Sequence, residues 1–448
     1  MVKSILRILI ICYIKKVMAE IDTILRHLHR DYKEPLRDPL WSNILLSPEL
    51  LRLVGLPSFQ GLNAIKQLGP TYLVYPGATH TRLNHSLGVF HIAHRMISHL
   101  LTKDGFQGFT LEGVKALLCA ALLHDLGHYP FAHSFKDLKV ESHEALTARR
   151  ILEEEYALII RNDLGVDPAL VAAIIDPELA YSGSTDVGFY RKLLSGVLDP
   201  DKLDYLNRDA YFCGIPYGVQ DVDFVLDELS FHAEHGLAIS RKGLPAVESI
   251  LFSKYLMYRS VYWHKTVRIA TAMIKKAVLM GLASGTVDTA SLYWMDDADF
   301  YALAAAADYP PLALIRQVQQ RQLYKRVGSL PFNRENPLHR NWQDLPARLA
   351  FEEALVREVS RRIGRPVPSE SIIVDIPEPI SFEIDLPVVD PLNESSVSFA
   401  ESKSVFTPEV VSGFAATLRQ ISLIAVRDPE VLAALEKMGP PRLLESGV

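Results

Sequence analysis

The 448-residue chain has few cysteines and no internal repeat, and these two features exclude several classes of protein. Its three cysteines, Cys12, Cys119 and Cys213, are odd in number and widely spaced. They give neither a disulfide framework nor a zinc-finger spacing, so we expect a reducing, cytoplasmic setting. Low-complexity tracts are also missing, and the composition has no disordered or fibrous bias.

The chain also lacks a long hydrophobic run. Residues 5–14 are apolar apart from Arg7, which is far short of the roughly 20 residues that a bilayer-spanning helix needs. Lys15 and Lys16 stand where a signal peptide would have small residues for cleavage. We therefore expect residues 1–18 to be an N-terminal extension, either a short surface helix or sequence upstream of a start at Met18, and we expect no membrane contact.

Excess charge of one sign is missing as well. The formal net charge is −6, with 22% of residues charged and 49% hydrophobic. A mildly acidic balance argues against broad, non-specific nucleic-acid binding, whereas it leaves room for an anionic small-molecule substrate. The length exceeds the usual size of one domain, so we expect a large helical domain, residues 19–285, and a smaller C-terminal region, residues 286–448.

What the chain does have is helical periodicity along most of its length. This predicts a mostly α fold: a helical bundle followed by a small mixed α+β C-terminal region. Ser142 predicts a helix start at His143, and β-branched runs between prolines predict two or three strands. The predicted helices are 48–53, 59–68, 80–99, 111–127, 143–160, 168–175, 246–282, 408–424 and 429–437, and the β-prone segments are 72–75, 371–375 and 380–384.

Histidine is concentrated in one stretch, because nine of the fifteen histidines fall between residues 75 and 143. At its centre the adjacent pair His124 and Asp125 ends the apolar run 116–123. Burying a carboxylate is costly unless a partner or a metal compensates it, although a lone buried histidine is more often a hydrogen-bonded core residue. Adjacent helical side chains point about 100° apart, so both can reach one ion only at a helix end, with ligands added from elsewhere. His85 and Asp201 are the candidates, and such a donor set suits a first-row transition metal.

The order of the motifs resembles the HD phosphohydrolase superfamily, in which a histidine, a His-Asp pair and a further aspartate come from three helices. The likeness is closer to the deoxynucleoside-triphosphate triphosphohydrolases and covers residues 35–285 most strongly. The segments that carry it are 59–60, 65–69, 75–78, 80–82, 85–89, 123–128, 130–133, 199–205 and 261–265, with 321–325 as a weaker match.

The resemblance implies a role for each matching residue. His85, His124, Asp125 and Asp201 would hold a divalent metal, and His128 and His143 would be the catalytic histidines. The residues that would contact substrate are Gln67, Leu68, Arg82, Lys202, Tyr205, Asp209, Lys254 and Tyr262. Without the resemblance, the tyrosines among them would be ordinary core or rim residues and the lysines ordinary solvated ones.

The chain departs from the family pattern in three places. Gly61 and Asn63 stand where regulated members have an Arg-x-Arg pair for an activating nucleotide, and Tyr258 replaces a common histidine of the substrate pocket. Lys136 replaces the acid that supports the catalytic histidine. Asp137 or Glu144 could take over as the carboxylate partner of His143, and we expect Asp137, because it follows Lys136 directly.

The resemblance therefore predicts a cytoplasmic enzyme that hydrolyses deoxynucleoside triphosphates to a deoxynucleoside and inorganic triphosphate. Its cofactor would be Mn, Fe, Zn, Co or Ni, with Mg²⁺ entering alongside the substrate phosphates, and the protein would be a homodimer or homotetramer. Two alternatives remain open at this point: an HD hydrolase of another nucleotide phosphoester, and a degenerate HD module that senses nucleotide or nucleic acid without turnover.

Overall fold

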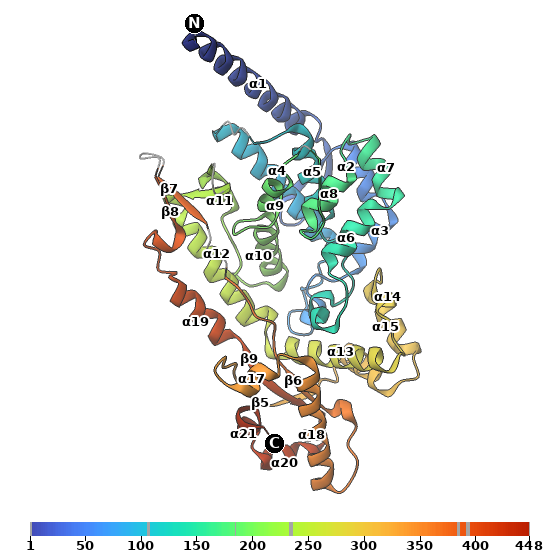
Figure 1. The fold of residues 1–448 in the computed structure, drawn as a ribbon. Helices are drawn as coiled ribbons and strands as arrows, with labels where there is room; N and C mark the ends of the chain where they lie inside the picture. Colours follow the sequence, from blue (N-terminus) through green and yellow to red (C-terminus); the bar gives the residue numbers. More distant parts are fainter. Residues whose placement is uncertain are drawn as a thin grey trace.

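The computed structural model describes residues 2–104, 108–183, 185–232, 236–382, 386–390 and 395–447. Helices dominate this part of the chain, as the sequence predicted, and three small sheets accompany them (Figure 1). The first helix, α1 (Val2–Arg30), projects from the body, and the C-terminal elements gather at the opposite end. Among the described residues, no helix is both long and apolar enough to cross a membrane.

The helical bundle is built around α5 (Leu111–Leu123), whose residues 116–123 are all buried. Thr110 caps this helix by accepting a hydrogen bond from the Gly113 amide. A helix that is apolar on every side needs neighbours on every side. The helices that contact it are α1, α4 (Arg82–Asp104), α8 (Pro168–Ile175) and α9 (Val187–Leu194), and α10 (Pro200–Cys213) packs on α4.

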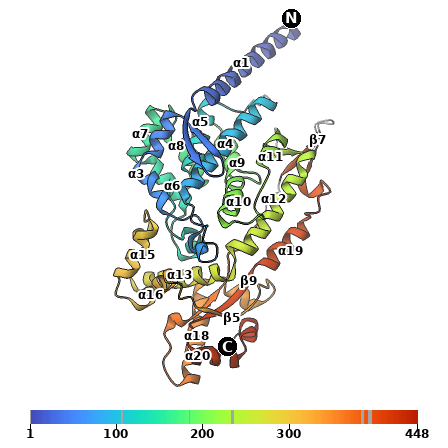
Figure 2. The ribbon, with the colours of Figure 1, turned by 180° about the vertical axis from the view of Figure 1, so that it is seen from behind.

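The other helices complete the bundle and build the C-terminal region. They are α2 (Pro48–Val54), α3 (Pro57–Gly61), α6 (His143–Leu152), α7 (Glu154–Asn162), α11 (Val222–Glu228), α12 (Leu244–Met257), α13 (Lys265–Ser284), α14 (Thr289–Leu292), α15 (Asp297–Ala306), α16 (Ala313–Gln319), α17 (Pro337–Asn341), α18 (Leu345–Ile363), α19 (Pro408–Leu418), α20 (Pro429–Met438) and α21 (Pro440–Ser446). Both views show α19 beside α12 (Figures 1 and 2), where the rings of Phe414 and Tyr255 stack 4.4 Å apart.

Each of the three sheets is small. An antiparallel hairpin joins β1 (Glu34–Asp38) and β2 (Ser42–Leu46). A second sheet has the order β3-β4-β7-β8, from β3 (Leu229–His232), β4 (Gly236–Ser240), β7 (Pro387–Asp390) and β8 (Ser395–Ser398). The C-terminal sheet places β9 (Gln420–Ala425) between β5 (Lys325–Pro331) and β6 (Ile372–Asp375), with Ile373 opposite Ile424.

Several predicted boundaries of helices and strands are wrong, because tertiary contacts decide the structure there. The predicted helix 408–424 ends at Leu418, because its last residues form β9, which is buried as the central strand. A short segment rich in apolar residues, such as 420–425, fits a buried strand as well as a helix. Residues 69–73 form a 3₁₀ helix rather than a strand. The segment 380–382 is in no strand, and the rest of that predicted strand, 383–385, lies outside the described residues.

Three further helices are shorter than predicted. Helix 59–68 stops at Gly61, and helix 143–160 is divided by the extended backbone of Glu153. The long helix 246–282 is interrupted by a π-helical turn, Tyr258–Tyr262. π-Helical turns often occur where a helix carries functional side chains, because the extra residue turns the next side chains to a new direction.

The core does not divide cleanly at residue 285. One hydrophobic cluster fills the bundle around α5, and another lies between α18 and the C-terminal sheet. A third cluster combines Phe135 and Leu146 of the bundle with α13 and with Ile373 and Ile424 of the sheet. The division into domains at 285 remains a prediction, and α13 connects both parts.

Candidate metal centre and substrate cavity

A cavity of about 530 Å³ opens between the bundle and the C-terminal region. Its walls come from the start of α4, the loop after α5, α10, the π-helical turn, α13 and the segment after β6. Of the residues that the sequence singled out, those lining it are Gln67, Leu68, Arg82, His85, His124, Asp125, Lys136, His143, Asp201, Tyr205, Asp209, Tyr258 and Tyr262.

The expected metal ligands meet at one end of this cavity. Helix α5 ends at Leu123, so His124 and Asp125 lie just beyond the helix end, as two adjacent ligands require. Ligand atoms of His85, His124 and Asp125 all lie within 4.8 Å of one another. Asp201, on the first turn of α10, places Oδ1 2.9 Å from His85 Nε2. The fold thus brings together residues from α4, from the end of α5 and from α10.

The hydrogen bonds of the two histidines show that they fit a metal. His124 Nδ1 lies 2.9 Å from the carbonyl oxygen of Ala121, which can only accept, so Nδ1 carries the proton. His124 Nε2 is buried and has no hydrogen-bond partner in the described part of the chain. His85 Nδ1 similarly donates to Asp204 Oδ2 at 2.8 Å. Each ring therefore offers an Nε2 lone pair, and outer hydrogen bonds of this kind orient metal-binding histidines in proteins.

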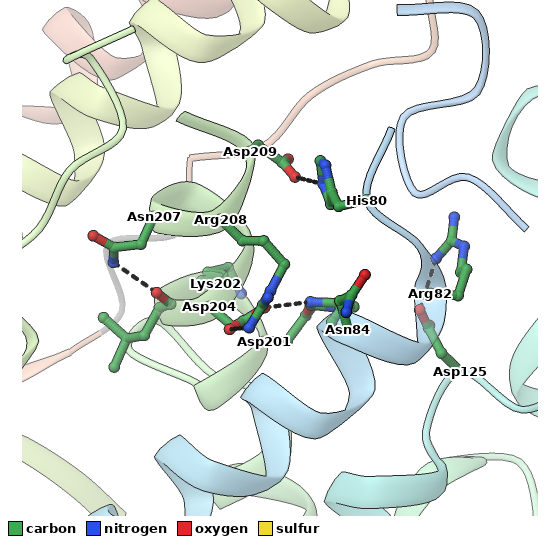
Figure 3. A network of polar contacts seen from close by, with 12 residues as sticks. His80, Arg82, Asn84, Asp125, Asp201, Lys202, Asp204, Asn207, Arg208 and Asp209 are labelled. Atoms are coloured by element: carbon green, nitrogen blue, oxygen red, sulfur yellow. Dashed lines mark hydrogen bonds and ion pairs between the residues drawn. The ribbon is translucent and has the colours of Figure 1, made fainter. Parts of the chain in front are cut away.

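The hydrogen bond from His85 to Asp204 leads into a buried ion network, of which Figure 3 shows Asp204 and Arg208. Asp204 and Arg208, both on α10, are fully buried and joined by two hydrogen bonds of 2.8 and 2.9 Å. Arg208 also donates to Asp38 Oδ2 at 2.8 Å, and Trp41 Nε1 donates to Asp204 Oδ1 at 2.5 Å. Arg208 offsets one of the two carboxylate charges, so the network keeps one negative charge, which favours a cation near His85.

The electrostatics of this end favour a cation. Burial opposes a charge on His85, but hydrogen bonds to Asp201 and Asp204 outweigh burial and raise the pKa of His85 to about 10. A proton and a metal ion compete for the same Nε2, so metal binding releases that proton. Burial also opposes the charge on Asp125, but His128 and Arg82 hold the pKa of that carboxyl well below its usual range. Arg82 is 2.7 Å from Asp125 Oδ2 (Figure 3).

Other residues of the cavity lining carry polar groups that suit a sugar. Asp209 accepts a hydrogen bond from the Tyr262 hydroxyl at 2.6 Å and contacts His80 Nε2 at 2.9 Å. The ring of Tyr205 meets Tyr262 edge-on at 6.4 Å. Gln67 Oε1 is buried without a hydrogen-bond partner among the described residues, although Gln67 lines the cavity. A hydroxyl group of a bound ligand would satisfy it.

The two lysines expected to bind phosphate do not line the cavity. Lys202 Nζ donates to Asp199 Oδ2 and to the Gly196 carbonyl, each at 2.7 Å. Lys254 Nζ donates to the Ser381 carbonyl at 2.8 Å. Their contact with substrate stays a prediction, and it requires both side chains to leave these partners.

Asp137 does not support His143 as the sequence predicted. Its carboxylate pairs with Lys275 of α13 at 2.6 Å and with Arg348 of α18 at 2.9 Å. Two cations hold it towards the C-terminal region, which is the physical reason that the predicted contact is wrong. Glu144 is the carboxylate beside His143 instead, with Oε2 3.1 Å from Nδ1.

His133 is a residue that the sequence prediction omitted. Its ring centroid lies 4.7 Å from that of His128 and 5.1 Å from that of His143, and it faces the cavity. The signal was present in the motif 130–133, which recurs in the family that the chain resembles. Burial is the largest cause that lowers the pKa of all three rings, and Lys136 contributes for His133 and His143.

Gly88 on α4 allows α4 and α10 to approach closely at the ion network. A Cβ atom at this position would overlap Asp204 Oδ1 and the Arg208 guanidinium. We expect Gly88→Ala to displace Asp204, loosen His85 and reduce metal affinity by roughly 10- to 100-fold, as for other lost outer hydrogen bonds. Metal titration followed by elemental analysis measures this. Gly413→Ala is the matched control, because its Cβ would meet open space; equal affinity in the two variants would refute the packing argument.

Comparison with known proteins places this site in a known class. Residues 82–179 match the family model of the HD domain, and residues 220–420 match that of the HD associated region. The His-Asp site and the helical bundle therefore define an HD-domain protein. The chain belongs to the HD superfamily and resembles its deoxynucleoside-triphosphate triphosphohydrolases.

Curated relatives show how far the likeness extends. An uncharacterized protein of Methanocaldococcus jannaschii, MJ1154, is 33% identical over 308 residues, which is 68% of this chain and 62% of the relative. YwfO of Bacillus subtilis, also uncharacterized, is 38% identical over 245 residues, 54% of each chain. The human deoxynucleoside triphosphate triphosphohydrolase SAMHD1 is 26% identical over 412 residues, 81% of this chain and 65% of the relative. The chain thus spans about half to two thirds of these relatives.

Solved structures share the fold. A phosphohydrolase from Bacteroides thetaiotaomicron superposes with a TM-score of 0.68 at 23% identity, over 88% of this chain and all of that one. A hypothetical protein from Aquifex aeolicus gives 0.67 at 27% identity, over 90% of this chain and 99% of that one.

Proposed function

We propose that this protein is a metal-dependent phosphohydrolase that converts deoxynucleoside triphosphates to a deoxynucleoside and inorganic triphosphate. The observation that carries the proposal is one cavity that is lined both by the His-Asp metal site and by the Asp209–Tyr262 pair. A divalent ion held by His85, His124, Asp125 and Asp201 would polarise a phosphoryl oxygen and lower the pKa of water.

The protein's own residues account for the rest of the reaction. Water attacks the α-phosphorus, the bond from that phosphorus to the 5′ oxygen breaks, and the 5′ oxygen takes up a proton. Arg82 neutralises phosphate charge, and His128 or His143 supplies the proton. Both rings have a lowered pKa in the free protein, so an anionic triphosphate beside them is needed to favour the protonated form.

Tyr262 and Asp209 would orient the sugar. The Tyr262 hydroxyl is fixed by its bond to Asp209, and both residues line the cavity. Where the Tyr262 ring contacts the sugar, it would accept a deoxy carbon, whereas a hydroxyl placed against the ring would lose its hydrogen bond to water. The homo-oligomeric state and the cytoplasmic setting stay predictions.

A second candidate follows from the two lysines that point away from the cavity. Lys202 and Lys254 are paired elsewhere, and three further cations of the cavity lining, Lys66, Arg268 and Lys275, are paired with carboxylates. Arg82 and Lys136 are the other two cations of the lining, and two cations suit a substrate with fewer phosphates, such as a nucleoside monophosphate. The candidate is therefore hydrolysis of another nucleotide phosphoester by the same site.

One experiment separates the two candidates. The protein is loaded with Mn²⁺ and incubated with each of the four dNTPs, the four NTPs and the four dNMPs, and products are resolved by chromatography. We expect deoxynucleoside and intact triphosphate from dNTPs alone. Release of monophosphate, or turnover of dNMPs only, would contradict the triphosphohydrolase proposal. No turnover of any nucleotide would indicate a binding module.

We expect that GTP is not an obligatory activator. Gly61 and Asn63 cannot supply the charge-assisted contacts that two arginines give a guanine nucleotide. Asn63 instead accepts a hydrogen bond from Thr81 at 3.2 Å. dATP hydrolysis with and without GTP measures this. Activity that appears only when GTP is present would contradict the prediction.

Lys136 should shift the pH dependence. Burial and His133 do most to lower the pKa of His143, and Lys136 lowers it further. If His143 must be protonated, activity falls as pH rises through its pKa. Lys136→Gln removes a cation, raises that pKa and moves the falling limb of kcat/KM to higher pH. Lys139→Gln makes the same charge change away from the cavity wall and should leave the profile in place. A profile that is identical in all three proteins would show that His143 is not the proton donor.

A further inference from the structure

The face that α13 turns to the cavity carries two cations. Arg268, Thr271, Ala272 and Lys275 all line the cavity. Their spacings of three, four and seven residues place them on one face of the helix. Arg268 donates two hydrogen bonds to Asp375, 3.0 and 2.5 Å long, so one carboxylate offsets this guanidinium. The charge of Lys275 is balanced less completely, because Lys275 shares its carboxylate.

The carboxylate that Lys275 shares is that of Asp137. Asp137 Oδ2 is 2.6 Å from Lys275 Nζ and 2.9 Å from a guanidinium nitrogen of Arg348. Both cations contact the same oxygen, and Asp137 Oδ1 has no hydrogen-bond partner in the described part of the chain. Burial is the largest cause that lowers the pKa of Lys275; Asp137 opposes it, and Arg348 adds to it. One carboxylate between two cations leaves an excess of positive charge at the cavity wall.

Lys136 adds a further cation to this part of the cavity. It follows His133 by three residues in the 3₁₀ segment Ala132–Leu138, and a 3₁₀ helix has three residues per turn, so both lie on one face. Both residues line the cavity. The next residue, Asp137, is on another face and pairs with Lys275 of α13, which packs on this segment. Lys136 itself is exposed, and among the residues that the structure describes no carboxylate pairs with it.

Histidines connect the metal end of the cavity to these cations. His128 Nε2 lies 3.2 Å from Asp125 Oδ1, and the ring centroid of His133 lies 4.7 Å from that of His128. Lys136 is one turn beyond His133, and its charge helps to lower the pKa of His133, although burial is the largest cause. The excess positive charge therefore lies next to the metal end, inside the same cavity.

Lys275 can turn from Asp137 to a ligand without leaving a buried charge unpaired. Arg348 would keep the Asp137 carboxylate, whose second oxygen is available to accept from it. Removing one of the two partners of a buried ion pair is strongly destabilising. Lys202 would cause that loss, because it is the cation beside Asp199, whose side chain is 3% exposed. Of these two lysines, Lys275 is therefore the better placed to bind a phosphate.

We propose that Lys136 and Lys275, the lysine pair, bind the terminal phosphate of a triphosphate chain whose first phosphate lies at the metal end. Ammonium groups make strong, charge-assisted hydrogen bonds to phosphate oxygens. The lysine pair lines the cavity, whereas Lys202 and Lys254 do not. That the triphosphate belongs to a substrate rests on the proposed function, whereas binding of inorganic triphosphate does not.

The first test measures binding without turnover. Inorganic triphosphate is titrated into the Mn²⁺-loaded full chain by calorimetry, with free Mn²⁺ held constant. We expect Lys136→Gln and Lys275→Gln each to weaken binding by roughly 10- to 100-fold, the usual effect of losing a charge-assisted hydrogen bond. Lys139→Gln is the matched control, because Lys139 is exposed and outside the cavity lining. Equal affinities in the wild type and Lys275→Gln would overturn the proposal.

Asp137→Asn should change the affinity in the opposite direction. The amide has no negative charge, so Lys275 and Arg348 would both lack a counter-charge until an anion binds. We expect inorganic triphosphate to bind severalfold more tightly to Asp137→Asn than to the wild type, and this gain should disappear when Lys275→Gln is added. A purely structural ion pair would give weaker binding in both single variants, since each breaks the same contact, and that result would overturn the proposal. Circular dichroism checks that each variant is folded.

Enzyme kinetics connect the lysine pair to the substrate. The KM for dATP and the Ki of dADP as a competitive inhibitor are compared in the wild type and Lys275→Gln. Because dADP lacks the third phosphate, Lys275→Gln should raise the KM for dATP by roughly tenfold or more and leave the Ki of dADP nearly unchanged. Equal changes in both constants would overturn the assignment to the terminal phosphate. A protein that binds inorganic triphosphate through the lysine pair but hydrolyses no dNTP would contradict the proposed function alone, so the two failures are distinguishable.

Discussion

Asp125→Asn should remove the bound metal and lower turnover by roughly 100-fold or more, because even the loss of an outer hydrogen bond to a metal ligand costs about 10- to 100-fold. An amide has no negative charge to offset the cation or to pair with Arg82, which lies 2.7 Å away. Elemental analysis and dATP hydrolysis measure the two losses. Asp223→Asn is the matched control, since Asp223 is an exposed partner of Arg95.

Removing the metal should also lower stability. A ligand that binds only the folded protein stabilises it by about 2.7 kcal/mol at a concentration 100 times its Kd. Chelation should therefore lower the Tm of the wild type and leave that of Asp125→Asn unchanged. Full retention of stoichiometric metal by Asp125→Asn would show that the assigned ligand set is wrong.

Arg208→Met is expected to cost the protein about 3–5 kcal/mol of unfolding free energy, the usual result of removing one partner from a buried ion pair. Arg208 is fully buried between Asp204 and Asp38, so both carboxylates would lose their counter-charge. Urea denaturation measures the free energy of unfolding.

A surface arginine provides the comparison for this variant. Arg26 pairs with Asp22 in a bridge whose side chains are 56% and 65% exposed, so Arg26→Met should cost less than about 1 kcal/mol. Metal affinity should fall in Arg208→Met as well, because Asp204 orients His85. A stability equal to that of Arg26→Met would mean that the buried network contributes nothing to the fold.

Local signals in the sequence predicted much of the bundle. Ser142 caps α6 as expected, and the helix 168–175 has the predicted bounds. In these cases a residue and its near neighbours decide the structure, because the cap accepts a hydrogen bond from an amide two or three residues along the chain. Residues 420–424 show the limit of such signals, since burial between β5 and β6 decides that they form a strand.

In the candidate site, too, some features follow from local sequence and others from distant contacts. The pair His124 and Asp125 stands out because a carboxylate after a buried apolar run needs a charge partner, and the structure places both at a helix end. Asp137 was assigned from its position beside Lys136 in the chain. Its true partners, Lys275 and Arg348, are 138 and 211 residues away, and no local pattern indicates them. The direction of a side chain towards or away from a cavity is settled by such distant contacts.

The pairing of Asp137 with α13 and α18 couples the histidine loop to the far end of the molecule. Asp137 belongs to the 3₁₀ segment that also carries His133, and Arg348 is on the helix that covers the C-terminal sheet. Any event that displaces α18 must break this ion pair or carry the loop with it. Linkage between two equilibria is reciprocal. If a ligand that binds in the cavity orders the loop, it stabilises the contact with α18, and the contact with α18 stabilises ligand binding by the same free energy. The carboxylate of Asp137 therefore makes the free energy of ligand binding in the cavity depend on the position of the C-terminal region.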